Sequence, residues 1–536
     1  MTISIVNMIP QSLSGETNQD SEPNIAVNSA DPQVIAGSAF TPDPDPNAIH
    51  APIFISTDGG NTWSLNSIVP HNEGITADIT LRFSSTNHLY AGYLALGDLA
   101  GLAVSRTGDM TFSSEMELIS HMVSGDQPYV QAATVLGGPN AGKERVYVGY
   151  SDGGAQMHYS LDGAAPQPTF STVQIESRGF QDGIGYNLPQ VRTAVHPDGV
   201  VYAVFYSVHI GGPPNGDLVD IVVVRDDQGG TGALPFTDLE DSADSKPGQR
   251  VVTNVFLPNG GFGQERGDGE LSIAVDPADS SILYVAWADE QASTGYTLHV
   301  RRSTDSGQSW PDNDLWTIPM AQNPALAVNS VGIVGFVYQQ FIDAQLPPRW
   351  ETHFRYTYIG GDMPLEDLVL ATVPADTPVG GQYNTYLGDY IHLMAVGEDF
   401  YGVFSANNTP DPDNFPNKVT YQRNHDFLTK KLFDVDGVTE VPISIDPFFF
   451  KITEIQKRAN LFIHIYEFAI DPLAVLLPSS VYVKLIEKFD PHVPKVAQIR
   501  DAARSMTLEE SAFVLARARM FIELAKEVEE ALSGGQ

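Results

Sequence analysis

The most regular feature of the chain is a unit of two short apolar stretches joined by a polar turn, which recurs along most of its length. In the clearest copies, Asn24–Asn28 runs to Val34–Gly37, and Ser272–Pro277 runs to Leu283–Trp287. The alternation within these stretches, together with the turn residues that bound them, predicts paired antiparallel β-strands. Weaker copies of the unit are Ile79–Tyr93, Tyr129–Tyr150, Val191–Phe205, Leu326–Tyr338 and His392–Phe404.

These seven units follow one another at intervals of roughly 50–80 residues, as expected for β-propeller blades with variable loops. Each unit alone would form a small twisted sheet that cannot bury both of its faces, so stability requires a closed ring. We therefore predict a mainly β fold, a propeller with seven blades, six being the rival count. The first residues, Ile3–Val6, either supply the last strand that closes the ring or form a disordered start.

A second pattern, Ser-x-Asp-x-Gly-x-Ser/Thr-Trp, occurs at Ser56–Trp63 and again at Ser303–Trp310. Asp in a tight turn accepts hydrogen bonds from the backbone N–H groups that follow it, and Gly provides the positive φ that the turn needs. The Trp then covers the hairpin with a large apolar face. The defining residues are Asp58, Gly60, Trp63, Asp305, Gly307 and Trp310.

This pattern resembles the Asp box (BNR repeat) of sialidases and related β-propellers, where it closes a hairpin on the outside of a blade. The resemblance implies a sialidase-like propeller that recognises a glycan on the face opposite the boxes. Degenerate copies at Ser105–Phe112 and Ser160–Gly163 fall where the third and fourth strands of their blades should meet.

Beyond Asn424 the apolar positions change to a helical period, as in Ile452, Ile455 and Ala459. We therefore predict three parts: a propeller over 1–424, a linker over 425–445 and a small α-helical C-terminal domain over 446–536. The apolar seam of the last segment, 507–532, either packs within that domain or joins copies of the chain into a homo-oligomer.

Composition narrows the class of protein. The chain has a net charge of −37 and 42% hydrophobic residues. A surface this acidic repels nucleic acid and favours cations or a basic protein partner, unless the charge serves solubility or a saline habitat. The absence of cysteine excludes disulfides and thiolate chemistry. No apolar run is long enough to span a membrane, and no secretory leader is evident, so we expect a cytoplasmic protein or one exported by an unconventional route.

The resemblance also implies a catalytic site, because sialidases hold the substrate carboxylate with three arginines and use an Asp acid/base and a Tyr–Glu nucleophile. The first-blade Arg-Ile-Pro motif that usually supplies one arginine is absent, and no arginine precedes Arg82. Tyr383, Tyr390 and Arg355 are further candidates, and core packing or surface ion pairing is the alternative role for all of them. The catalytic candidates are Glu265, Glu270, Tyr386, Arg192 and Arg266.

Aligning the units suggests an acidic ring at one mouth of the central channel, because equivalent positions just before the first strands are mostly acidic. We hypothesise that Ca²⁺ or a basic group of a partner lies there, the alternative being that these residues satisfy backbone donors at the strand starts. Two Pro- and Asp-rich loops, 41–47 and 409–414, are weaker cation candidates. The ring positions are Glu22, Asp78, Asp126, Gln190, Glu270, Asn323 and Asp389.

Three functions are compatible with these features. The first is glycan recognition, with or without glycoside hydrolysis, in which aromatic side chains stack on sugar rings. The second is a non-enzymatic protein-interaction scaffold assembled through the C-terminal helices, and the third is a cation-dependent lyase or hydrolase at the channel mouth. The candidate stacking residues are Trp287, Tyr206, Tyr338 and Tyr386.

Overall fold

The structure is a computed structural model, and it describes residues 1–45, 47–71, 74–97, 100–136, 140–178, 190–209, 215–258, 271–291, 295–343, 347–357, 364–375 and 387–455. These residues form strands and short 3-10 helices, among them η1 (Gln11–Leu13) and η4 (Pro412–Asn414), and of the described residues only the last, Ile455, is in an α-helical conformation. The predicted mixture of propeller and helical domain is therefore wrong as a description of this part of the chain, which is all β. No helix within it is long and apolar enough to cross a bilayer.

Seven antiparallel sheets of four strands each account for most of the described residues, and they are numbered here as blades in chain order. Blade 1 contains β2 (Asn24–Val27), β3 (Ile35–Ser38), β4 (His50–Ser56) and β5 (Ser64–Pro70), and blade 2 contains β6 (Ile79–Phe83), β7 (Leu89–Ala95), β8 (Gly101–Thr107) and β9 (Glu117–Met122). Blade 3 contains β10 (Asp126–Thr134), β11 (Glu144–Ser151), β12 (Ala155–Ser160) and β13 (Phe170–Gln174).

The remaining blades follow the same order. Blade 4 contains β14 (Val191–Val195), β15 (Val201–Val208), β16 (Gly216–Asp226) and β19 (Gln249–Pro258), with the hairpin β17 (Glu240–Asp241) and β18 (Lys246–Pro247) inserted. Blade 5 contains β20 (Leu271–Asp276), β21 (Asp279–Gln291), β22 (Gly295–Ser303) and β23 (Trp316–Pro319), and blade 6 contains β24 (Ala321–Val328), β25 (Val334–Ile342), β26 (Arg349–Thr357) and β27 (Pro364–Pro374). Blade 7 contains β28 (His392–Val396), β29 (Asp399–Asn407), β33 (Ile445–Thr453) and β1 (Thr2–Asn7).

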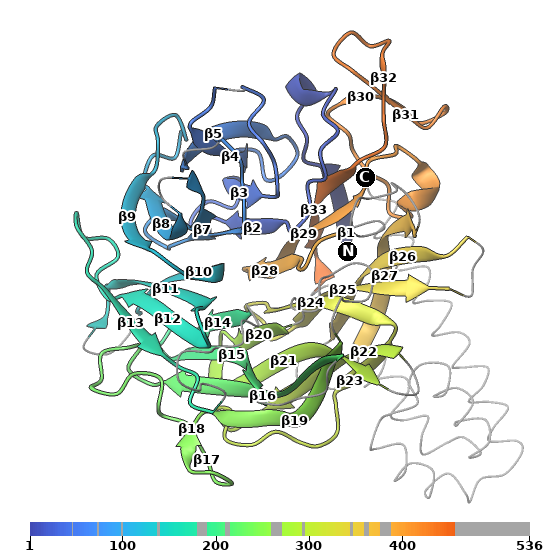
Figure 1. The fold of residues 1–536 in the computed structure, drawn as a ribbon. Helices are drawn as coiled ribbons and strands as arrows, with labels where there is room; N and C mark the ends of the chain where they lie inside the picture. Colours follow the sequence, from blue (N-terminus) through green and yellow to red (C-terminus); the bar gives the residue numbers. More distant parts are fainter. Residues whose placement is uncertain are drawn as a thin grey trace, which may run out of the picture. The chain divides into compact units, whose positions relative to one another are not determined.

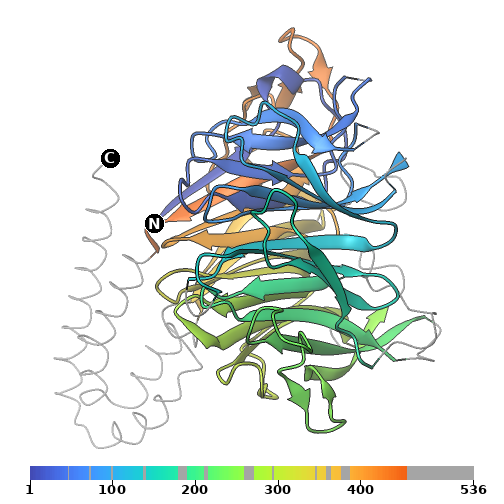
Figure 2. The same cartoon turned by 90° about the vertical axis from the view of Figure 1, so that its left-hand side faces the viewer.

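The blades close into a ring. The innermost strands contact one another in the order β2, β6, β10, β14, β20, β24, β28, and β28 in turn contacts β2. Figure 1 shows them around one centre, and Figure 2 shows the sheets of successive blades side by side. The paired strands of every predicted unit coincide with the first two strands of a blade, so this part of the chain is a seven-bladed propeller rather than a six-bladed one.

The ring is closed by the two ends of the propeller. β1 pairs antiparallel with β33, with Ile5 opposite Phe450 and Val6 opposite Phe449. Of the two roles predicted for Ile3–Val6, closing the ring is the one that the structure confirms.

The domain boundary predicted near Asn424 is wrong, because the chain returns to blade 7 beyond it. Residues 425–445, predicted as a linker, include a three-stranded sheet of β30 (Asn424–Asp426), β31 (Lys431–Phe433) and β32 (Glu440–Val441). Residues 446–453, predicted to begin the helical domain, lie in β33, where the ring of Phe449 packs against Trp63 of blade 1 and that of Phe450 against Phe354 of blade 6. The rest of the predicted domain, 456–536, lies outside the described residues.

The two Ser-x-Asp-x-Gly turns connect the third and fourth strands of blades 1 and 5. In the first, Asp58 accepts hydrogen bonds from the backbone N–H of Thr62 at 2.9 Å and from its hydroxyl at 2.7 Å. In the second, Asp305 accepts the equivalent bonds from Ser309 at 3.0 and 2.6 Å. The degenerate turns at Asp109 and Asp162 occupy the same place in blades 2 and 3 and use the same kind of bond.

The core lies between blades rather than inside any one of them. The cluster around Ile53, Leu81 and Tyr93, for example, is built from blades 1 and 2. Trp63, from the turn of blade 1, packs edge-on against Phe449 of blade 7, with ring centroids 5.4 Å apart. Each blade therefore gains its stability from its neighbours, which is the physical reason for the closed ring.

Candidate functional site

Side chains at the starts of the innermost strands fasten each blade to the next. An acceptor atom near the start of one strand receives the backbone N–H of the following innermost strand, which satisfies a donor that would otherwise be unpaired. The bonds are Asn24 Oδ1 with Leu81 N at 2.9 Å, Thr80 Oγ1 with Val130 N at 2.8 Å, Gln190 Oε1 with Leu271 N at 3.1 Å, Ser272 Oγ with Leu326 N at 2.9 Å, and His392 Nδ1 with Ile25 N at 3.3 Å.

This belt surrounds a small cavity at the centre of the ring. Its volume is about 20 Å³, enough for about one water molecule. The polar side chains that line it include Thr80, Tyr129, Arg192, Tyr390 and His392, from blades 2, 3, 4 and 7. A larger ligand can reach this cluster only at the mouth of the cavity.

Two arginines belong to this cluster, and no ion pair joins either of them to a carboxylate among the described residues, although the charge of Asp78 acts on Arg192. The guanidinium of Arg192 lies over the ring of Tyr129, 5.0 Å from its centroid, and over that of Tyr390, 5.4 Å away. The NH2 group of Arg82 lies 3.5 Å from His392 Nε2, and its buried Nε has no hydrogen-bond partner. Burial lowers the pKa of both guanidinium groups.

His392 contacts both Arg82 and Tyr129 in this cluster. Because its Nδ1 accepts the N–H of Ile25, we assign the proton of the neutral ring to Nε2, which lies 3.3 Å from the hydroxyl oxygen of Tyr129. Burial, then the positive charges of Arg82 and Arg192, hold the pKa of His392 well below its usual value. The imidazole is therefore neutral at physiological pH and acts as a fixed donor and acceptor.

Three carboxylates, those of Asp78, Glu22 and Asp389, also face this cluster. Burial and then the negative charges of these carboxylates raise the pKa of Tyr390 well above its usual value, whereas the positive charge of Arg192 acts to lower it. The Tyr390 hydroxyl therefore keeps its proton.

Gly388 allows two of these carboxylate residues, Glu22 and Asp389, to approach each other closely. Its φ of +107° suits glycine, and a Cβ there would lie 2.5 Å from the backbone nitrogen of Glu22. This close approach brings the segment that carries Asp389 against Glu22.

The structure brings some of the residues named in the sequence analysis together and places others elsewhere. Arg192, Glu22, Asp78 and Asp389 meet at the centre of the ring, as do Gln190 and Asn323, which hydrogen-bond neighbouring blades. Asp126 is half exposed, and its Oδ1 accepts the N–H of the next residue, so nothing here places it in the cluster. Glu265, Arg266, Glu270, Tyr383 and Tyr386 lie outside the described residues.

Sequence reasoning missed Tyr129 and His392 and gave Arg82 no role. Each of the three lies in the first strand of a repeat unit. Because the first strands surround the centre of the ring, this position was the signal in the sequence that could have identified them. Arg355, a further candidate, is elsewhere: it lies on β26, the third strand of its blade, with NH2 2.6 Å from Asp367 Oδ2.

Two of the predicted sugar-stacking residues are not available for stacking. Trp287 is 1% exposed and Tyr338 is 0% exposed, because each lies between blades under a stacked histidine. Tyr206 lies near Arg192, where it contributes to the electrostatics of the guanidinium. Tyr386 is outside the described residues.

The described residues contain no group of three or more Asp, Glu or His side chains arranged to hold a metal ion. In the loop 409–414, the ammonium of Lys430 lies 2.7 Å from Asp411 Oδ2 and 3.4 Å from Asp413 Oδ2, so the chain supplies its own cation. In the loop 41–47, the carboxylate of Asp43 accepts hydrogen bonds from Ser67 Oγ and, at 2.7 Å, from Asp45 N.

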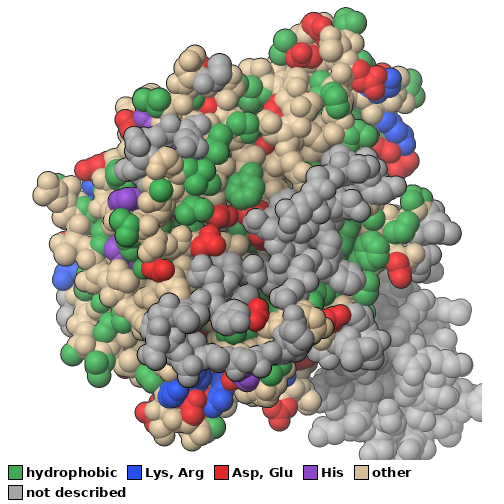
Figure 3. All heavy atoms as spheres, viewed as in Figure 1, with side chains coloured by type: hydrophobic (Ala, Val, Ile, Leu, Met, Phe, Trp, Pro, Cys, Tyr) green, Lys and Arg blue, Asp and Glu red, His purple; other side chains and the backbone are tan. Residues whose placement is uncertain are grey.

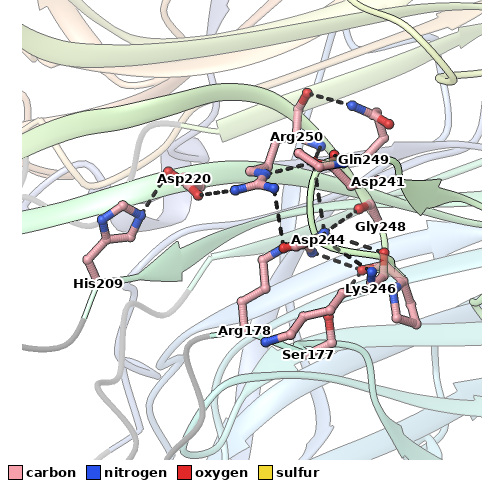
Figure 4. A network of polar contacts seen from close by, with 12 residues as sticks. Ser177, Arg178, His209, Asp220, Asp241, Asp244, Lys246, Gly248, Gln249 and Arg250 are labelled. Carbon is pink, nitrogen blue, oxygen red and sulfur yellow. Dashed lines mark hydrogen bonds and ion pairs between the residues drawn. The ribbon is translucent and has the colours of Figure 1, made fainter.

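A second polar cluster, formed by blade 4 and by the segment that follows β13, pairs its arginines with carboxylates (Figure 4). Arg178 Nε lies 2.8 Å from Asp244 Oδ2, and Arg250 Nε lies 2.6 Å from Asp241 Oδ2. Asp220 links Arg250, at 3.6 Å, to His209, at 2.8 Å. Each guanidinium here forms a close ion pair with a carboxylate, whereas no such ion pair of Arg82 or Arg192 is found among the described residues, so the central cluster is the better candidate for a ligand site.

Acidic side chains also gather near the centre of the face seen in Figure 3, beside residues that are not described. The site therefore presents two kinds of chemistry at once. The arginines attract a negative group, whereas carboxylates and tyrosines offer hydrogen bonds to neutral hydroxyl groups.

No family model and no curated protein matches the chain. Among solved structures it is similar to an α-L-arabinofuranosidase of Fusarium graminearum, with 14% identity over 63% of this chain and 92% of that one and a TM-score of 0.40. It is also similar to a sialidase of Trypanosoma rangeli, with 12% identity over 85% and 58% and a TM-score of 0.36, and to a protein of unknown function from Dyadobacter fermentans, with 10% identity over 84% and 99% and a TM-score of 0.40. At these TM-scores the likenesses assign no activity to this chain.

Proposed function

We propose that this protein recognises a carbohydrate at the mouth of the central cavity, and that Arg82 and Arg192 select a sugar that carries a carboxylate. The observation that carries the proposal is the pair of buried guanidinium groups with no ion pair among the described residues. A buried guanidinium that makes no direct ion pair is costly, and a bound carboxylate would supply charge-assisted hydrogen bonds that the more distant Asp78 does not.

The rest of the cluster suits the remainder of a sugar. The carboxylates of Glu22, Asp78 and Asp389 are acceptors for ring hydroxyls, and the protonated hydroxyl of Tyr390 is a donor. The net charge of −37 opposes long polyanions at a distance. The expected ligand is therefore a short acidic oligosaccharide rather than a heavily charged polymer.

Glycoside hydrolysis is a second candidate, favoured by the closeness of several carboxylates to Tyr390. A pair of carboxyl groups can act as general acid and general base at a glycosidic bond. Turnover of aryl glycosides that is lost in Asp78→Asn would support this activity.

A glycan array followed by calorimetry tests recognition. We expect binding of oligosaccharides that contain sialic or uronic acid and much weaker binding of their neutral or methyl-esterified forms. Arg192→Leu should lower the affinity by about 100-fold, because it removes a charge-assisted contact and leaves its partner unpaired.

Arg301→Leu is the matched control. Its guanidinium also lies over an aromatic ring, that of Trp287 at 5.2 Å, but on β22, the third strand of blade 5. This variant should lose stability and keep its affinity. Equal binding of acidic and neutral sugars, or an unchanged affinity in Arg192→Leu, would refute selection by the arginines; silence on every glycan would refute recognition itself.

A further inference from the structure

Four ionisable side chains meet where the ring closes. Arg423 and Asp446 are fully buried, and NH1 lies 2.8 Å from Oδ2. Asp20 is also fully buried, and neither oxygen of its carboxylate has a hydrogen-bond partner. Glu16 adds a third carboxyl group to the cluster, and its buried Oε2 is likewise without a partner. One guanidinium therefore faces three carboxyl groups.

These side chains fasten the connection between β1 and β2 to blade 7. Arg423 donates from NH2 to the carbonyl oxygen of Ser14 at 2.8 Å and to that of Glu16. The backbone N–H of Asp20 donates to the carbonyl oxygen of Ile445 at 2.8 Å. From the end of β1, Asn7 Nδ2 donates to Asp446 Oδ2 at 2.7 Å. We call Glu16, Asp20, Arg423 and Asp446 the closure cluster.

The charges of the closure cluster cannot balance when all its carboxyl groups are ionised. Burial, then Asp446, raise the pKa of Glu16 to about 8, against the opposing charge of Arg423. Burial, then Glu16 and Asp446, hold the pKa of Asp20 well above its usual value. A proton on each is the cheapest way to neutralise a buried excess of negative charge.

The other titratable groups on the elements packed here do not remove this excess. Burial raises the pKa of Tyr421 well above its usual value, so it stays neutral. Asp434 lies beside Gly15 and adds negative charge. His425 Nδ1 lies 2.8 Å from the carbonyl oxygen of Arg423 and adds positive charge only when it is protonated.

We propose that the closure cluster binds residues 10–20 to blade 7 only while Glu16 is protonated. Loss of that proton releases this segment, and β1 remains paired with β33. Asp20 lies two residues before Glu22, so release of this segment also loosens one wall of the central site. The pairing of β1 with β33 does not involve the carboxyl groups of the cluster.

The direction of the pH dependence follows from the linkage between protonation and closure of this segment. A carboxyl group that binds its proton more tightly in the closed state stabilises that state fully below its ordinary pKa of 4.5, and the effect is lost as pH rises through about 8. The proton of Glu16 alone should therefore increase the opening of residues 10–20 by about tenfold per pH unit between pH 5 and 8, and any proton that Asp20 loses on opening makes the slope steeper. Hydrogen exchange of the full-length protein at pH 5.5, 6.5 and 7.5, corrected for the intrinsic rates, measures this opening.

In Glu16→Gln the dependence on pH should fall to what Asp20 still contributes, and the double variant with Asp20→Asn should be flat. Glu398→Gln, an exposed change between β28 and β29, should behave like the wild type. A wild-type segment whose corrected exchange does not change with pH would overturn the proposal, and so would an unaltered slope in Glu16→Gln. The first outcome needs no variant, so it decides the matter even if Glu16→Gln does not fold.

Discussion

The imidazole of His299 lies flat on the indole of Trp287, with ring centroids 5.0 Å apart and planes inclined by 12°. Both imidazole nitrogens face carboxylates, Nδ1 at 2.7 Å from Asp314 and Nε2 at 3.3 Å from Asp289. Blade 6 repeats the arrangement with His353 stacked on Tyr338, 4.9 Å apart and inclined by 9°. The same cross-strand stack thus stabilises the same position in two neighbouring blades.

The stack in blade 5 should make stability depend on pH. Burial disfavours the charged imidazole, but the hydrogen bonds and charges of Asp289 and Asp314 outweigh it and raise the pKa of His299 to about 9. The resulting stabilisation is present in full below pH 6.5 and is lost as pH rises through 9. In urea unfolding, the free-energy difference between wild type and His299→Gln should shrink by about 3 kcal/mol from pH 6 to pH 10. A constant difference would contradict a charged His299.

The closing strand should be essential to the ring. Val6 is 2% exposed in the pairing of β1 with β33, so Val6→Asp would bury an unpaired carboxylate. We expect a loss of more than about 4 kcal/mol in the free energy of unfolding. Thr2→Asp places the same charge at an exposed position of the same strand and should change stability by less than about 0.5 kcal/mol. Similar effects of the two changes would argue against closure by β1.

Gly60 should be irreplaceable for two separable reasons. Its φ is +91°, and a Cβ there would lie 2.1 Å from Phe449 Cε1. Gly142 has a φ of +81° but open space around its Cβ position. Gly142→Ala should therefore cost about 1–2 kcal/mol for conformation alone, and Gly60→Ala clearly more. Thermal unfolding of both variants isolates the steric part, and equal melting temperatures would show that Phe449 does not crowd this turn.

The two tryptophans of the repeated turns should contribute unequally. Trp63 is 4% exposed and packs on Phe449, whereas Trp310 is only partly buried, although it occupies the same position of its turn. Trp63→Ala should cost about 3–5 kcal/mol in chemical denaturation, and Trp310→Ala distinctly less. The reverse order would mean that burial in these turns does not govern their stability.

The strands of the blades were predictable because their signals are local. Alternation within Asn24–Val27 or Leu271–Asp276 requires no knowledge of distant residues, and the Ser-x-Asp-x-Gly turns bond to themselves. The prediction failed at the C-terminal side of blade 7. There a long excursion from Asn407 to Ile445 separates two paired strands, and the apolar residues of β33 were assigned to a helix.

From the sequence alone one could derive a repeated β unit, seven copies of it and a first strand able to close a ring, since period, turn chemistry and spacing are properties of neighbouring residues. Only the tertiary structure decided which polar side chains meet. Arg82, Tyr129, Arg192 and His392 come from four blades and are brought together by ring closure, which sets the side chains that face the axis and the charges that lack a partner. The excess of carboxyl groups around Arg423 likewise exists only because both ends of the propeller meet in blade 7.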